Sequence, residues 1–191
     1  MSKFLTGLLI GIILVPAGFY LYLRSGDAPV ATWAPPMPLE RFLVKTAMHA
    51  TINHEETPIH LTNVSDGSLI AGAQIYRQDC AVCHGLPDQP ATAVAEGMYP
   101  HPPQFFRPNA KKIDDPASEV YWKVKNGIRL TGMPGFRASL NDKQVRELAG
   151  FLEGATSLPP AAMAVLKSAP AKVQETSSPS GRHAPKMHKR A

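Results

Sequence analysis

The chain has 191 residues and only two cysteines, which excludes a disulfide framework and a four-thiolate metal site. It carries 20 Lys and Arg against 15 Asp and Glu, a formal net charge of +5. Residues 155–191 hold six basic residues and one acidic residue, so residues 1–154 are balanced at 14 of each sign. The basic isoelectric point of the whole chain therefore comes from residues 155–191 and does not describe the charge of residues 1–154.

An uncharged apolar stretch of about twenty residues, 4–23, opens the chain. As a helix it is long enough to cross the roughly 30 Å hydrocarbon core of a bilayer. The alternative is a cleaved secretory signal peptide, whose apolar part is shorter, about 7–15 residues, and is followed by small residues. Here Tyr20, Tyr22 and Arg24 stand in that place, and they suit the lipid-water boundary. The sequence favours an uncleaved anchor over residues 1–24.

Residues 25–65 are predicted to be a proline-containing linker, semi-rigid where prolines cluster between positions 34 and 38. A short helix is expected near residues 39–50. Its apolar face should dock on the domain that follows, with docking on a partner as the alternative. The residues of this face are Leu39, Phe42, Leu43 and Ala47.

A helix capped by Asp66 or Ser68 is predicted to run directly into Cys80. Its apolar residues recur at helical spacing. They are Leu69, Ile70, Ala73, Ile75 and Tyr76.

The pattern Cys80-x-x-Cys83-His84 follows at the end of that helix. It is typical of a site where two thiols hold a haem covalently and the adjacent histidine ligates its iron. Two cysteines at this spacing can each form a thioether with one of the two vinyl groups on a haem edge. Two alternatives stay open. A redox-active dithiol would need a thioredoxin-like βαβ context that the sequence lacks, and a zinc site would depend on His183 and His188 in the distant tail.

A haem iron held by histidine needs a second axial ligand, and Met133 is the candidate. Gly132 and Gly135 remove side-chain bulk around it, and Pro134 restricts the local backbone. The alternative is that this methionine fills a gap in the core.

Two other residues compete with that assignment. Met98 precedes a proline-rich run but lacks glycines on both sides. His101 lies among prolines, and ligation by a second histidine would give a centre of lower potential.

Two further helices are predicted, over about residues 116–126 and from Asn141 to Gly154. The first follows two aspartates expected to cap it and has proline at its first helical position. Gly72 and Gly150 would let the first and last helices of the domain cross closely, and two merely tolerated helical glycines are the equal alternative. The residues expected to flank a haem are Phe105, Tyr121, Trp122, Ile128 and Phe136.

Taken together, these motifs resemble the class I c-type cytochrome family over roughly residues 66 to 154. The matching segments are residues 72–85, residues 126–134 and the terminal amphipathic helix. The resemblance implies an all-α fold, with a small cytochrome c-like helical domain wrapping one haem and its first helix packed on its last. It also implies attachment and ligation residues for one haem c. These are Cys80 and Cys83 for the thioethers, and His84 and Met133 for the iron.

Four segments are therefore expected along the chain. They are an N-terminal transmembrane anchor (1–24), a proline-containing linker with a possible short helix (25–65), a cytochrome c domain (66–154) and a basic Ala/Pro/Ser-rich tail, largely disordered (155–191).

The expected function is one-electron transfer in a periplasm-facing respiratory chain, not catalysis by the chain itself. Because c-type haem is attached on the outer side of the bacterial inner membrane, the resemblance implies a single-pass anchor with the haem domain in the periplasm. The expected partners are redox proteins, such as a membrane dehydrogenase, a bc1-type complex or an oxidase, and no nucleic acid. The alternatives are an electron-transfer subunit of a membrane dehydrogenase or terminal oxidase, or, if Met133 does not ligate, a haem gas sensor or weak peroxidase.

Overall fold

The computed structural model describes residues 2–55, 59, 64–107, 113 and 115–168, and these form helices and loops without a β-strand. The predicted all-α class is therefore confirmed. In chain order the elements are α1 (Ser2–Ser25), α2 (Glu40–Glu55), α3 (Asp66–Ile75), the π-helical turn η1 (Tyr76–Cys80), α4 (Ala81–His84), α5 (Ala93–Glu96), α6 (Ala117–Asn126), α7 (Asp142–Glu153) and α8 (Pro160–Lys167).

Local capping chemistry fixes where these helices begin. Asn141 caps α7 in a reciprocal pair with Gln144, each side chain accepting the other residue's backbone N–H, so the predicted start is confirmed. The start of α3 differs from the prediction, because its cap is Ser65, whose hydroxyl accepts the backbone N–H of Ser68 at 3.2 Å. Pro116 itself stands at the cap position of α6, one residue earlier than expected.

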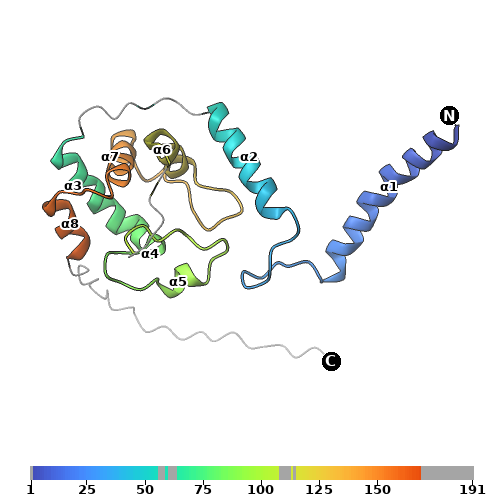
Figure 1. Ribbon diagram of the computed structural model, residues 1–191, viewed down its shortest axis with the longest axis horizontal. Helices are drawn as coiled ribbons and strands as arrows, with labels where there is room; N and C mark the ends of the chain where they lie inside the picture. The colour runs from blue at the N-terminus through green and yellow to red at the C-terminus, as the bar shows by residue number, and fades with distance from the viewer. Residues whose placement is uncertain (1, 56–58, 60–63, 108–112, 114, 169–191) are drawn as a thin grey trace, which may run out of the picture.

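Helices α3 and α7 pack against each other and organise the core (Figure 1). Their backbones approach closely at Gly72. A Cβ on Gly72 would collide with the carbonyl oxygen of Glu147 and lie 2.5 Å from Phe151 Cβ. Glycine is therefore required for the close approach of the two backbones. Tyr76, Leu148 and Phe151 fill the crossing and are fully buried.

Helix α8 was not predicted, and it extends the packed structure beyond Gly154. It packs on α3, with Ala162 and Leu166 fully buried. Arg77 of η1 donates a hydrogen bond to the carbonyl oxygen of Val165 at 3.2 Å. The rest of the expected tail, residues 169–191, lies outside the described part of the chain.

Helix α1 stands apart from the helical domain and buries none of its residues (Figure 1). Its 24 residues would span about 36 Å at 1.5 Å per residue, so its length and composition suit a membrane crossing.

Helix α2 is held against the helical domain near both of its ends. Arg41 Nε donates to the hydroxyl of Tyr99 at 3.2 Å, and Trp122 Nε1 donates to the Glu55 carboxylate at 3.2 Å. Ile52 is buried between these two contacts along the helix. The prediction of a docked face was wrong in its residues, since Leu39, Phe42 and Leu43 are exposed.

Candidate haem site

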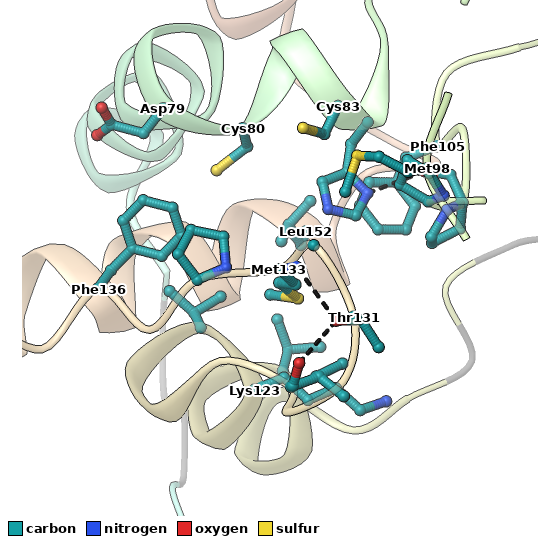
Figure 2. A pocket seen from close by; sticks show the side chains of 18 of the residues that line it. Asp79, Cys80, Cys83, Met98, Phe105, Lys123, Thr131, Met133, Phe136 and Leu152 are labelled. Carbon is teal, nitrogen blue, oxygen red and sulfur yellow. Dashed lines mark hydrogen bonds between the residues drawn. The ribbon is translucent and has the colours of Figure 1, made fainter. Parts of the chain in front are cut away.

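An apolar cleft opens between the segment η1–α4, the loop from Met98 to Phe105, helix α6 and the loop from Ile128 to Phe136 (Figure 2). The empty space within it is about 930 Å³, part of it open to solvent. The four residues predicted for the site all line this one cleft; they are Cys80, Cys83, His84 and Met133.

Both cysteines come from the junction of η1 and α4. In η1 the backbone N–H of Ala81 reaches the carbonyl oxygen of Tyr76, five residues back, so the helix widens by one residue just before α4. Cys80 and Cys83 then stand along the same wall of the cleft (Figure 2). Burial raises the pKa of the Cys80 thiol to about 12, with the negative charge of Asp79 adding to the effect.

The imidazole of His84 is fixed in position by two neighbours. Its Nδ1 is 2.9 Å from the carbonyl oxygen of Pro103, which makes Nδ1–H the donor and leaves Nε2 with a free lone pair. Its ring stacks on Phe105, with centroids 4.7 Å apart and planes 5° apart. Burial lowers the pKa of His84, and the bond to Pro103 opposes that shift. The neutral imidazole favoured by burial is the form that coordinates a metal.

The segment after His84 is tied to the helical core. The buried hydroxyl of Tyr76 donates to the carbonyl oxygen of Gly85 at 2.7 Å. Gln104 Nε2 donates to the carbonyl oxygen of Cys83 at 2.8 Å. Gly85 has a φ of +79°, a left-handed conformation that favours glycine. Gln104 was not predicted, since its contact joins positions 21 residues apart with no local sequence signal.

Met133 is presented by a loop that folds back on itself. Its backbone N–H donates to Thr131 Oγ1 at 3.1 Å, and that hydroxyl donates to the carbonyl oxygen of Ile128 at 2.7 Å, as the dashed lines in Figure 2 show. The N–H of Ile128 donates in turn to the carbonyl oxygen of Met133 at 3.2 Å. The loop therefore holds its own shape while its methionine lines the cleft.

This arrangement fits a covalently attached haem. The walls are mostly apolar side chains, as a porphyrin face requires, and two thiols stand on one wall. An imidazole with a free Nε2 and a thioether sulfur supply two donors suited to haem iron. A comparison with protein families gives a matching result. The family model for cytochrome c oxidase, cbb3-type, subunit III, matches residues 67–152.

Residues 67–152 form a c-type cytochrome domain.

No curated protein and no solved structure matches the chain significantly. The cytochrome domain carries covalently attached haem c and serves haem-based electron transfer, so the predicted family and cofactor are confirmed. The residues that match the family model end in α7 and do not include α8, although α8 packs on α3 of the same domain.

Both rivals of Met133 also line the cleft of the cytochrome domain. A Cβ on Gly132 would collide with the methyl group of Met98, so the two loops meet there. His101 lies with its Nδ1 3.3 Å from the carbonyl oxygen of Ala95. The glycine beside Met133 thus makes room for a second methionine, a role that the sequence did not suggest.

The predicted haem neighbours divide into two groups. Phe105, Ile128 and Phe136 line the cleft, whereas Tyr121 and Trp122 face a separate polar hollow beside Glu55. Several cleft residues on helix faces were not predicted to line the site. Val120 and Val124 follow the four-residue spacing of α6, and Leu152 follows Leu148 at the same spacing in α7, which is the signal that would have found them. Lys123 had no such signal.

Proposed function

We propose that the cytochrome domain is a one-electron carrier. Cys80 and Cys83 would hold the haem through two thioethers, while His84 Nε2 and the Met133 sulfur would ligate its iron. The observation that carries this proposal is that His84, with Nδ1 already occupied by Pro103, and Met133 line one apolar cleft with the two cysteines.

The haem supplies the Fe(III)/Fe(II) couple, and the protein sets its properties. The Met133 thioether favours the ferrous state and raises the potential relative to a second histidine. With both His84 and Met133 bound to the iron, no coordination position would remain for an external ligand. The ligand set therefore suits electron transfer and disfavours catalysis or gas sensing by this chain alone.

The proposed setting is a bacterial respiratory chain. Helix α1 would anchor residues 1–24 in the inner membrane, and the linker of residues 25–65 would carry the cytochrome domain in the periplasm. Its donors and acceptors would be a membrane dehydrogenase, a bc1-type complex or an oxidase.

A second candidate function is that of an electron-transfer subunit inside a membrane oxidoreductase. The family model that matches residues 67–152 describes a subunit of a cytochrome c oxidase, and this observation favours the alternative. Purification from membranes in mild detergent separates the two. A free carrier would elute alone, whereas a subunit would co-elute with the catalytic subunits.

The ligand assignment is tested by visible spectra of the full chain produced in a host that matures c-type haem. We expect the haem to stay attached after denaturation. We also expect that the reduced wild type does not bind carbon monoxide. Met133→Leu should bind carbon monoxide. Met98→Leu is the matched control, since it changes a methionine in the same cleft and should leave the spectrum unchanged. Carbon monoxide binding by Met98→Leu but not by Met133→Leu would overturn the assignment.

A further inference from the structure

Helix α2 has a side that faces the cytochrome domain. Val44 and Met48 are half-buried and Ile52 is fully buried, at the four-residue spacing of one helix face. Arg41 and Glu55, which make the hydrogen bonds to Tyr99 and Trp122, lie on the same side. The cytochrome domain therefore lies against this side of α2, with hydrogen bonds near both ends of the helix.

Apolar residues on the other side of α2 remain exposed. At about 100° per residue, Phe42 points about 160° away from Val44 around the helix axis. Leu39 and Leu43 adjoin it, and in the preceding linker Val30 and Trp33 are also exposed. We call Val30, Trp33, Leu39, Phe42 and Leu43 the juxtamembrane apolar set; their exposed fractions run from 59% to 93%.

The segment that carries this set has no net charge. Between Val30 and Leu43 the charged residues are Glu40 and Arg41, one of each sign. The Glu40 carboxylate accepts the backbone N–H of Met37 at 2.8 Å, and Arg41 donates to Tyr99. A mostly apolar surface of this kind, with no net charge, matches an apolar partner.

The segment is also continuous with the proposed anchor. Val30 stands five residues after Ser25, where α1 ends, and the first turn of α2 is its end nearer to α1 (Figure 1). Tyr20, Tyr22 and Arg24 in the last turns of α1 are residue types that prefer the membrane interface, as is Trp33.

We propose that the juxtamembrane apolar set lies in the interface of the bilayer that α1 spans, with its side chains among the lipid headgroups and the first acyl carbons. This inference rests on the proposed anchoring by α1. Because Arg41 and Glu55 on the opposite side of α2 bind Tyr99 and Trp122, α2 then connects the membrane surface to the cytochrome domain and limits how the domain is oriented over the membrane.

The test uses the two tryptophans of the chain, Trp33 and Trp122. The full, haem-loaded chain is placed in lipid nanodiscs made with ordinary or brominated phospholipids. The bromines are at shallow acyl carbons, because interfacial segments bury their apolar face about 5–10 Å deep. The contribution of Trp33 to the fluorescence is the emission of the wild type minus the emission of Trp33→Phe. We expect this contribution to be largely lost in brominated lipid, while the remaining emission of Trp33→Phe is the same in both lipids.

Serine substitutions test the role of α2. Phe42→Ser/Leu43→Ser should restore Trp33 emission in brominated lipid. In oriented membranes, the electron paramagnetic resonance spectrum of the oxidised haem should change with the angle between the membrane plane and the magnetic field. The double variant should weaken this change. The matched control is Val94→Ser on α5, an apolar residue of 54% exposure, which should change neither signal. All three side chains are exposed, so the visible spectrum should report an intact cytochrome domain in each variant.

Carbonate extraction of membranes separates this inference from the anchoring on which it rests. A chain that resists extraction but shows equal Trp33 emission in both lipids would overturn the inference and leave the anchor standing. A chain released by carbonate would refute the anchor itself. A dimer in detergent that Phe42→Ser/Leu43→Ser dissociates would assign the apolar set to a second copy and overturn its assignment to lipid.

Discussion

The ring of His84 lies flat against the ring of Phe105, with centroids 4.7 Å apart and planes 5° apart. Phe105 also receives positional support from its own backbone, whose N–H donates to the carbonyl oxygen of His84 at 3.2 Å. Together with the bond from His84 Nδ1 to Pro103, these contacts fix both the position and the rotation of the imidazole.

Phe105→Leu should loosen that rotation. The free energy of unfolding should fall by about 0.5–1.5 kcal/mol from the lost ring pair. With the imidazole plane less restricted, the electron paramagnetic resonance spectrum of the oxidised protein should broaden. Phe136→Leu changes a ring of the same cleft that does not stack on His84. An equal broadening in that control would show that the stacking has no special effect.

Gly72→Ala should destabilise the α3–α7 crossing. The added methyl group would meet the Glu147 carbonyl and Phe151 Cβ, neither of which can move without shifting a helix. Overpacking of this kind costs about 1–3 kcal/mol, measurable by guanidinium denaturation followed at the haem band. Gly67→Ala in the first turn of α3 is the control, since its methyl would lie 3.7 Å from Ser65 Oγ. If both variants were equally stable, the close crossing would not need glycine.

Gly135→Ala should weaken Met133 ligation more than Gly132→Ala does. A Cβ at Gly135 would lie 2.6 Å from the backbone oxygen of Asn126, whereas a Cβ at Gly132 meets only the terminal methyl of Met98, which can rotate away. The far-red charge-transfer band of methionine-ligated ferric haem measures the effect. A larger loss of this band in Gly132→Ala than in Gly135→Ala would contradict this explanation.

Asp142 should contribute to acid stability. The hydrogen bond from the Tyr121 hydroxyl, followed by that from Arg146, lowers the pKa of Asp142 to about 2 from its ordinary value of 3.8. Ionised Asp142 therefore stabilises the fold above about pH 4, and this contribution is lost as the pH falls toward 2. Asp142→Asn should flatten the loss of stability in this window, measured by urea unfolding at each pH. Asp88→Asn, which removes an exposed ion pair with Lys167, should leave the loss in place.

Features whose signals lie in neighbouring residues could be predicted from the sequence. The start of α7 at Asn141 and the haem-attachment pattern each depend on a few neighbouring residues, so both could be predicted. Helix α8 was not predicted, although its buried residues Ala162 and Leu166 lie four positions apart and Pro160 stands at its start. Its stability comes from burying Ala162 and Leu166 against α3.

The docked side of α2 shows a different limit. The helix carries one apolar set beginning at Leu39 and another running from Val44 to Ile52, and either could have met the domain. The side that docks is the one whose Arg41 and Glu55 bind Tyr99 and Trp122. These partners lie 58 and 67 residues away along the chain, so the sequence near α2 does not indicate them. For the same reason the sequence identified Cys80, Cys83, His84 and Met133 as candidates but missed Pro103 and Gln104, which hold the His84 segment in place.

Tyr76 joins the helical core to the loop that carries His84. Its ring contacts Phe105, Phe106 and Phe151 at centroid distances of 5.2–6.4 Å, and its hydroxyl holds the carbonyl of Gly85. The histidine loop therefore cannot open as a separate unit without disturbing the α3–α7 crossing. Opening of the loop at His84 is therefore coupled to the core, and the hydrogen-bonded amide of Gly85 should be protected from exchange with solvent.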